Sequence, residues 1–392
     1  MILYLHIIIG IYTLLLLFFI IGFNRTPIVP IPAKSPKSCF SIIIAFRNEA
    51  VHLPALLQSL SQLQYPRELY EIFLVNDSSE DTSSQTVLDF IANQKFNNIH
   101  LLENIRTSAS PKKDAIRTAI HCAQNEWILT TDADCLVPAT WLLSSDSFIQ
   151  AHHPELIAAP VTLATPKTSG FLYAFESLDI HSLLGATIGA FGLGKPFMAN
   201  GANLCYRKVS FLAVNGFDGN DHIASGDDIF ILEKFLKAFP QKVMYLKHRD
   251  VLVKTSAQTD WGGFISQRVR WAAKATGYSA VFPKVVGVLV FWTNLTSVFV
   301  VLGLFITLLN QVLLMGSGFA FAKAELPTLL FIIFWKFIID AILIWKGLIF
   351  TDSRRDFTAY PIVALLYPFV SVYVAMRAFT GTYRWKGRQF KQ

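Results

Sequence analysis

Long apolar runs near both ends of the chain enclose a central region in which short apolar runs alternate with amphipathic ones. Residues 1–23 carry one histidine and no formally charged side chain, over about the 20 residues that a helix needs to span a bilayer. A secretory signal would show a basic start, a shorter apolar core and a cleavage site of small residues. We therefore expect residues 1–23 to form a transmembrane anchor.

Further apolar segments follow near the C-terminus, before a basic tail at 381–392. These segments are 285–314, 328–350 and 358–380. Four complete passes from an outside N-terminus would place the tail outside, whereas basic segments normally stay on the cytoplasmic side. Three passes and one re-entrant or interfacial segment would remove the conflict. The last segment is the candidate, because Pro361 and Pro368 interrupt its helical pattern.

Between these ends, a Pro-rich linker at 24–38 leads into a region of mixed composition at 39–284. Short β-rich runs alternate there with stretches of helical periodicity, which predicts βαβ units and an α/β domain with a mostly parallel sheet. The expected strands are 40–46, 72–77, 98–102, 126–134 and 156–163, and the first expected helices are 49–63 and 81–93. Ligands of such sheets bind at the carboxyl ends of the strands. Basic residues in the linker place this domain in the cytoplasm.

Composition supports a membrane protein and argues against a nucleic-acid-binding one. Hydrophobic residues make up 53% of the chain and charged residues 16%, whereas about a quarter of a soluble domain is charged. The net charge is +7, but the Lys and Arg residues lie beside apolar runs, which is typical of contact with anionic lipid headgroups. The four cysteines are far apart and carry no metal-binding spacing, so we expect reduced thiols.

Polar side chains follow the first two expected strands. The first strand runs into Ala45-Phe-Arg47-Asn-Glu49, which either forms an ordinary solvated turn or hydrogen-bonds a base or ribose. Asp77 ends the second strand. It either caps the next helix or extends the same polar site.

Asp132-Ala-Asp134 is the strongest single motif, because it follows the apolar strand 126–134 directly. Two carboxylates at positions i and i+2 can converge on one hard cation, and Mg²⁺ and Mn²⁺ prefer oxygen ligands. Such an ion can also bridge a diphosphate and make a nucleoside diphosphate a good leaving group. The motif therefore predicts a divalent metal beside a nucleotide.

Two further groups each have a structural and a functional interpretation. Asp227 and Asp228 precede a helical stretch; they either cap that helix or provide a general base for an acceptor hydroxyl. Gln267, Arg270 and Trp271 share one helix just before the apolar C-terminal region. They either form a basic-aromatic belt at the membrane or pair with phosphate.

Taken in this order, the motifs resemble those of the family-two glycosyltransferases over residues 39–275. The resemblance implies a GT-A fold (Rossmann-like, mostly parallel sheet), transfer with inversion, and a divalent Mg²⁺ or Mn²⁺ ion. It places a metal site at Asp132 and Asp134, with Asp134 preferred as direct ligand. It also implies a catalytic base at Asp228 with Asp227 as its neighbour. The implied nucleotide-sugar pocket comprises Ala45, Arg47, Glu49, Asp77, Asp132, Gln267, Arg270 and Trp271.

Other positions of the resemblance are less determined. A lysine of the family contacts the phosphates, but Pro111 replaces the usual preceding glycine, which leaves Lys112 and Lys113 as alternatives. Gly201 and Asn203 would border the donor sugar and the acceptor. The stretch 171–197 is either an amphipathic helix on the bilayer surface or a buried helix.

These expectations combine into a metal-dependent inverting glycosyltransferase that uses a nucleotide-sugar, a UDP-sugar first. We expect a lipid or lipid-linked acceptor, contact with membrane lipids, and no nucleic acid. The protein would be integral to the bacterial inner membrane, with its catalytic domain cytoplasmic. One alternative is a processive polysaccharide synthase. Another is a non-catalytic membrane scaffold or transporter, for which Lys336 and Asp340, able to pair at i and i+4, offer thin support.

Overall fold

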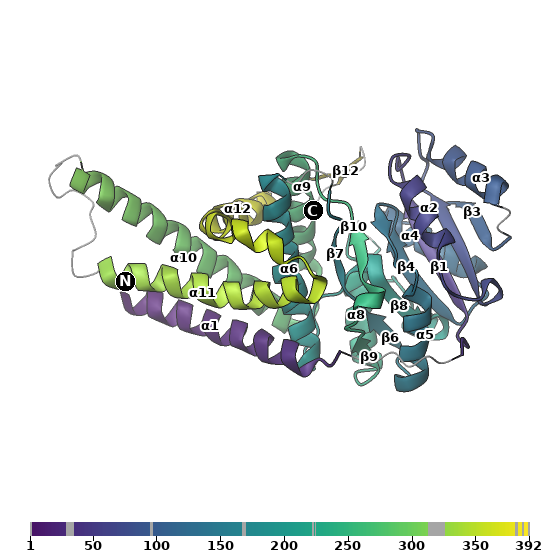
Figure 1. Cartoon of the computed structure of the whole chain (residues 1–392), viewed down its shortest axis with the longest axis horizontal. Coiled ribbons are helices and arrows are strands. Elements are labelled where there is room, and N and C mark those ends of the chain that lie inside the picture. Colours follow the sequence, from purple (N-terminus) through teal and green to yellow (C-terminus); the bar gives the residue numbers. More distant parts are fainter. Residues whose placement is uncertain are drawn as a thin grey trace. The chain divides into compact units, whose positions relative to one another are not determined.

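A computed structural model describes the chain in two compact units that interleave along the sequence (Figure 1). The helical unit comprises Met1–Asn24, Gly170–Leu193 and Asp260–Gly381, and the sheet unit comprises Arg25–Ser169, Gly194–Thr259 and Thr382–Gln392. The described residues are 2–28, 35–94, 97–166, 170–221, 223, 225–312, 326–380, 383–385 and 388–390. Parts of the expected linker and of the expected basic tail lie outside them.

This division differs from the single domain expected at 39–284. Residues 170–193 and those from 260 onward group with the apolar helices. The physical reason is packing: Phe175 and Leu178 share a buried cluster with Phe264, Leu348 and Tyr360 of the helical unit. Apolar side chains buried in this way stabilise the association of the helices that carry them.

The sheet unit is built on a seven-stranded sheet with the order β3-β2-β1-β4-β8-β6-β9. The first four strands in this order are parallel; β8 is antiparallel to both β4 and β6, and β9 is parallel to β6. The bounds of the strands are β1 (Phe40–Phe46), β2 (Tyr70–Asn76), β3 (Ile99–Glu103), β4 (Trp127–Asp132), β6 (Leu156–Ala158), β8 (Leu204–Arg207) and β9 (Val243–Tyr245). The predicted α/β class with a mostly parallel sheet is confirmed.

A smaller sheet of order β5-β10-β7 lies in the same unit. Its strands are β5 (Cys135–Leu136), β7 (Val161–Leu163) and β10 (Val253–Thr255), and a separate pair is formed by β11 (Tyr383–Trp385) and β12 (Arg388–Phe390). The helices of this unit are α2 (Leu53–Ser61), α3 (Ser83–Gln94), α4 (Pro111–Cys122), α5 (Trp141–His152), α7 (Lys208–Ala213) and α8 (Asp227–Ala238), with short 3₁₀ turns η1 (Arg67–Leu69), η2 (Gly201–Asn203) and η3 (Arg249–Val251).

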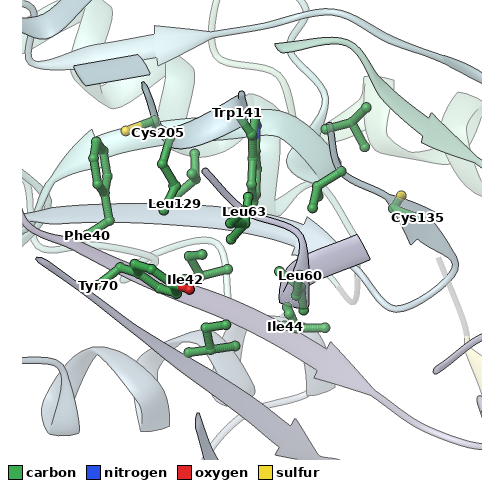
Figure 2. Close-up of a cluster of buried hydrophobic side chains, with 14 of the residues drawn as sticks. Phe40, Ile42, Ile44, Leu60, Leu63, Tyr70, Leu129, Cys135, Trp141 and Cys205 are labelled. Carbon is green, nitrogen blue, oxygen red and sulfur yellow. The ribbon is translucent and has the colours of Figure 1, made fainter. Parts of the chain in front are cut away.

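Alternate residues of β1 form the centre of the core. Phe40, Ile42 and Ile44 point into a cluster that also holds Leu129 of β4 and Trp141 of α5 (Figure 2). Apolar residues of α2 and α3 join the same cluster, while α4 packs against β1 and β2. Because successive side chains of a strand point to opposite faces, α4 covers the other face of the sheet. Strands buried on both faces read as continuous apolar runs, as 40–46 does.

The helical unit contains the four helices that are long and apolar enough to cross a membrane among the described residues: Leu3–Arg25, Val281–Leu309, Leu326–Thr351 and Arg354–Phe379. The α-helices of this unit are α1 (Ile2–Arg25), α6 (Phe171–Gly192), α9 (Trp261–Ala273), α10 (Val281–Val312), α11 (Leu326–Thr351) and α12 (Tyr360–Thr380), with 3₁₀ turns η4 (Lys274–Gly277) and η5 (Arg354–Ala359). Helices α1, α10 and α11 lie side by side (Figure 1) and share the buried residues Leu5, Val300 and Leu329.

Two expectations about these helices are decided by the structure. Pro368 lies inside α12, and the helix continues from Tyr360 to Thr380. The prediction that Pro361 and Pro368 interrupt this helix is therefore wrong. A proline removes a single backbone hydrogen bond, which membrane helices tolerate where neighbouring groups compensate. Helix α6 is mostly buried, with Phe175, Leu178 and Ile188 at the core. It is therefore the buried helix, and the amphipathic surface alternative is not supported.

Helix α1 is packed tightly into the helical unit. Its Gly22 faces α6 so closely that an added Cβ would lie 1.9 Å from the carbonyl oxygen of Gly189, and a Cβ on Gly189 would lie 2.3 Å from that of Phe19. Small residues allow such close approach of membrane helices. A polar contact adds to it: the Tyr12 hydroxyl donates to Asp340 Oδ1 (2.7 Å), and Lys336 pairs with Asp340 Oδ2 (2.6 Å).

We predict that Gly22→Leu lowers the midpoint of thermal unfolding of the detergent-solubilised protein. The new Cβ would lie 1.9 Å from the backbone carbonyl oxygen of Gly189, and no change of rotamer moves a Cβ. Helices α1 and α6 must therefore separate, which lowers the free energy of unfolding by at least about 1–3 kcal/mol. Gly10→Leu in the same helix is the matched control, because a Cβ at Gly10 meets nothing within 4 Å. Equal midpoints for the two variants would contradict the close crossing.

Candidate active site

The carboxyl ends of β1, β2 and β4 meet at one edge of the large sheet. In the strand register Ala45 lies beside Asp132, and Phe46 lies beside Asn76. The sheet order also reverses here, because β2 and β3 follow β1 on one side and β4 lies on the other. Open α/β sheets bind ligands at such a switch point. The expected residues Ala45, Asp77 and Asp132 are therefore brought to the same edge.

Arg47 holds two of the loops at this edge together. Its guanidinium donates to the backbone carbonyl oxygens of Asp77 (2.8 Å) and Ser78, and it pairs with Glu80 (2.6 Å). The loop is reinforced by Glu49, whose backbone N–H donates to Ser83 Oγ (2.7 Å). Arg47 and Glu49 thus shape the loops in this structure, and direct contact of either side chain with a nucleotide stays a prediction.

Asp77 is nearly buried behind these loops. Its carboxylate accepts a hydrogen bond from Asn104 Nδ2 (2.7 Å) and faces Arg106 Nη1 (3.4 Å). Arg106 in turn lies 3.5 Å from Asp114, a fully buried carboxylate. Burial alone would raise the pKa of Asp114, but hydrogen bonds from Ser108 and Thr107 lower it overall. Asp114 therefore stays ionised and fixes the loop that precedes α4.

Lys112 links two of the expected carboxylates in the centre of the site. Its ammonium nitrogen lies 2.7 Å from Asp132 Oδ1 and 3.0 Å from Asp227 Oδ2, and the side chain is 19% exposed. Burial would lower the pKa of Lys112, but the two carboxylates raise it, so the ammonium stays charged. A cation is thus held between β4 and the start of α8.

Gly201 completes this cluster. A Cβ at this position would lie 2.6 Å from Asp227 Oδ2 and 3.1 Å from Lys112 Nζ, so a larger residue would have to displace one end of the ion pair. The carbonyl oxygen of Gly201 accepts a hydrogen bond from Thr130 Oγ1 of β4 (2.7 Å). We name Lys112, Asp132, Gly201 and Asp227 the ion-pair cluster.

The structure gives two expected residues other positions. Lys113 is fully buried, donates to the carbonyl oxygens of Asn220 (2.6 Å) and Ile223 (2.9 Å), and lies over the Phe230 ring. Adjacent helical residues point in different directions, so of the two alternative lysines only Lys112 joins the ion-pair cluster.

Asn203 likewise lies in the core, with 2% of its surface exposed. Its amide donates to the carbonyl oxygens of Pro160 (2.8 Å) and Val251 (2.7 Å), and its oxygen accepts from Trp141 Nε1 (2.9 Å). These contacts tie η2 to α5, to the segment between β6 and β7, and to η3, so the Asn203 side chain is held in the core. Its place beside the donor sugar stays a prediction.

Asp134, two residues after Asp132, is held by the smaller sheet. Its Oδ2 accepts from Thr255 Oγ1 of β10 (3.3 Å), and its Oδ1 lies 3.7 Å from Cys135 Sγ. Burial raises the pKa of the Cys135 thiol, and the charges of Asp134 and Asp132 raise it further, so this cysteine is a neutral neighbour and not a thiolate ligand.

The donor set fits a divalent ion that is completed by its substrate. Among the residues that the structure describes, no group of three or more His, Cys, Asp or Glu side chains is placed to hold a metal. Asp132 and Asp134 supply hard carboxylate oxygens, and Asp132 already faces a cationic group, Lys112. Mg²⁺ is usually held by one or two carboxylates together with substrate phosphates. The two aspartates match that kind of incomplete site.

The acidic pair begins α8 after Gly226, whose φ of +89° lies in the left-handed region. Asp227 faces Lys112, whereas Asp228 Oδ1 accepts the backbone N–H of Ile229 (2.8 Å). The position agrees with the capping interpretation, because carboxylates at a helix start are favoured by its dipole. The role of either aspartate as a general base stays a prediction.

Gln267, Arg270 and Trp271 lie on α9 in the helical unit, while every other expected site residue lies in the sheet unit. Their joint action with the ion-pair cluster stays a prediction. The sequence interpretation also missed Thr255, Asn104 and Arg106, which hold expected residues in place. Side chains that act on a carboxylate from a distant loop leave no local pattern in a sequence.

Comparison with known protein families and curated proteins identifies relatives of this chain. The family described as Glycosyl transferase family 2 matches residues 41–175, and Glycosyl transferase family group 2 matches residues 127–372. A poly-beta-1,6-N-acetyl-D-glucosamine synthase of Staphylococcus epidermidis is 23% identical over 256 residues, which are 64% of this chain and 57% of that synthase. A beta-monoglucosyldiacylglycerol synthase of Trichormus variabilis is 26% identical over 144 residues, 36% of this chain and 30% of that enzyme. The chain thus spans little more than half, or less, of the length of these relatives.

A solved structure shares the fold. The mannosyltransferase PcManGT from Pyrobaculum calidifontis, in complex with GDP-Man and Mn²⁺, aligns with a TM-score of 0.53 and 14% identity over 96% of this chain and 99% of that one. At this identity the likeness shows the fold and no more. The group 2 family match covers more than half of the chain. The protein therefore belongs to the family-2 glycosyltransferases and has a GT-A fold.

Proposed function

We propose that the protein is an inverting, metal-dependent glycosyltransferase that moves a sugar from a nucleoside diphosphate donor to a lipid or lipid-linked acceptor at the cytoplasmic membrane face. The observation that carries this proposal is the ion-pair cluster, in which an ammonium group and two carboxylates meet at the switch point of the sheet. Such a constellation suits a ligand that brings both phosphates and a divalent cation.

In this proposal the donor enters at the ends of β1, β2 and β4. Asp77 lies where a base would be read, held by Asn104 and Arg106. Lys112 turns from the carboxylates to the diphosphate, because phosphate oxygens carry more negative charge than either carboxylate. Gly201, which has no side chain to separate it from Lys112 and Asp227, borders the donor sugar. Gln267, Arg270 and Trp271 contribute from α9 to the diphosphate and the acceptor region.

The chemistry follows from these positions. Asp228 takes the proton of the acceptor hydroxyl, whose oxygen attacks the anomeric carbon as the bond to the diphosphate breaks. The nucleoside diphosphate leaves with the electron pair, and the configuration inverts in a single displacement. Asp132 and Asp134 would hold Mg²⁺ or Mn²⁺, which when bound stabilises the negative charge of the leaving diphosphate.

Support for a lipid acceptor comes from the helices and from one relative. In the part of the chain that the structure describes, four helices are apolar and long enough to cross a membrane, and the matched beta-monoglucosyldiacylglycerol synthase is named for a glycolipid product. A UDP-sugar is the first donor to test. GDP-mannose is the second, because the structural neighbour was solved with it.

A polysaccharide synthase is the second candidate, because the poly-beta-1,6-N-acetyl-D-glucosamine synthase matches the larger part of this chain. The length of the product distinguishes the two candidates. Purified protein is incubated with a panel of UDP- and GDP-sugars and a membrane lipid extract, and the products are analysed by mass spectrometry. We expect nucleoside diphosphate release that depends on lipid and a product one sugar larger than its acceptor. Long polymer would establish the second candidate, and no release from any donor would contradict both.

A further inference from the structure

A buried charged network holds α9 inside the helical unit. Arg268, with 8% of its surface exposed, donates through Nε to Asp179 Oδ2 of α6 (2.5 Å). Asp179 Oδ1 accepts a second hydrogen bond from the Tyr367 hydroxyl of α12 (3.0 Å). Glu176, one turn before Asp179 on α6, adds a carboxylate oxygen 3.8 Å from Arg268 Nη2. Three helices that are distant in sequence are thus joined through the Asp179 carboxylate.

The same guanidinium also contacts the motif residues of α9. Arg268 Nη1 donates to the side-chain oxygen of Gln267. The Cζ atom of Arg268 lies 4.5 Å from the ring centroid of Phe264 and 4.3 Å from that of Trp271. Gln267 and Trp271 are two of the three residues expected at the diphosphate and acceptor. Arg268 therefore restrains the side chains of Gln267 and Trp271. Asp179 of α6 in turn restrains Arg268, and Tyr367 of α12 restrains Asp179.

A buried ion pair is weak support for stability alone, because desolvation offsets much of the attraction. An apolar contact between α6 and α9 would serve equally well, and Phe175 and Phe264 already provide one at 5.5 Å between ring centroids. Charged groups retained at such a place restrict the rotamers of what they touch. Here they touch Gln267 and Trp271.

We propose that Arg268, Asp179 and Tyr367 are positioning residues for transfer: they set the side chains of Gln267 and Trp271 through a hydrogen-bonded line that begins on the apolar helix α12. The inference rests on the proposed function for its consequence in catalysis. None of the three residues contacts donor or acceptor in this account. Their removal should lower the rate of transfer more than it lowers stability.

The test compares Asp179→Asn, Arg268→Gln and the double variant in the full-length protein. Each single change leaves a buried charge without its partner, so we expect a lower unfolding midpoint and little activity. The double variant removes both charges of the closest pair and leaves Glu176 without the guanidinium, so its midpoint should recover part of the loss. Its kcat should stay about 10- to 100-fold below wild type, because misplaced contact groups cost that much. Recovery of kcat together with the midpoint would overturn the inference.

Two tyrosines of α12 provide a second pair of variants that changes no charge. Tyr367→Phe removes only the hydroxyl that Asp179 accepts, whereas Tyr360→Phe removes one that donates to the carbonyl oxygen of Phe337 (2.6 Å). Each variant loses one buried hydrogen bond, and the loss in Tyr367→Phe is the larger because its acceptor is a carboxylate, so its unfolding midpoint should be somewhat lower than that of Tyr360→Phe. We expect kcat to fall several-fold for Tyr367→Phe and to stay at the wild-type value for Tyr360→Phe. Equal kcat values would overturn the inference.

A readout without turnover separates this inference from the proposed function. The Trp271 fluorescence is taken as the difference between each protein and its Trp271→Phe counterpart, and its quenching by acrylamide is measured. Loss of the guanidinium should make Trp271 more accessible in the double variant and leave it unchanged in Tyr360→Phe. An inactive wild type would contradict the proposed function alone. Unchanged quenching in the double variant would contradict the positioning role, whatever the activity.

Discussion

Asp228→Asn is expected to lower kcat by about 10²- to 10⁴-fold, the usual contribution of a general base. The amide keeps the shape of the side chain and can still cap α8, where Asp228 accepts the N–H of Ile229, but it cannot take the acceptor proton. Binding of UDP should be unchanged. Release of nucleoside diphosphate and calorimetric titration with UDP measure the two effects separately.

Asp227→Asn is the matched control for this prediction. Asp227 pairs with Lys112 at 3.0 Å, so its replacement should change the affinity for the donor more than kcat. A severe loss of kcat in Asp227→Asn with an active Asp228→Asn would reverse the two roles and show that the base is the carboxylate inside the ion-pair cluster.

Lys112→Met should have two opposite effects on binding. The affinity for UDP should fall by about 10- to 100-fold, because a charge-assisted hydrogen bond contributes roughly 1.5–3 kcal/mol. Binding of Mn²⁺ without nucleotide should become stronger by about tenfold, because Asp132 and Asp227 lose the ammonium that neutralises them. Electron paramagnetic resonance of free Mn²⁺ and titration calorimetry measure these changes.

The neighbouring lysine gives the contrast. Lys113→Met removes two hydrogen bonds to backbone carbonyls in the core, so it should lower the unfolding midpoint and leave Mn²⁺ affinity unchanged. The exposed Lys242→Met controls for the loss of one positive charge. If Lys112→Met left both affinities at the wild-type values, the ion-pair cluster would not be the donor site.

Much of the fold could be predicted because buried parallel strands read as continuous apolar runs. The expected strand 40–46 coincides with β1, and the runs at 72–77 and 126–134 overlap β2 and β4. The expected strand 156–163 is divided into β6 and β7, which belong to different sheets. Pro160 lies between them and has no N–H for a ladder, so the chain leaves one sheet there and enters the other.

The sequence predicted where the candidate site lies, but not which of its neighbouring side chains face that site and which enter the core. Lys112 and Lys113 differ by one position, and only the packing of α4 decides which reaches Asp132 and which enters the core. Asn203 was expected beside the donor sugar because its segment resembles one of the family, yet the η2 turn directs its side chain into the core. Arg268 lies between the expected residues Gln267 and Arg270, and its partners come from α6 and α12, so its network could be seen only in the structure.

Metal-dependent binding of UDP is the most direct test of the ion-pair cluster as a nucleotide-sugar site. Wild-type protein and Asp132→Asn are titrated with UDP in Mn²⁺ and in EDTA, with the exposed Asp218→Asn as a charge-matched control. We expect saturable binding in Mn²⁺ for wild type and Asp218→Asn, and a large loss of affinity in EDTA and in Asp132→Asn. Equal affinity in all of these conditions, or no binding of either UDP or GDP by the wild type, would contradict the assignment of the ion-pair cluster as a nucleotide-sugar site.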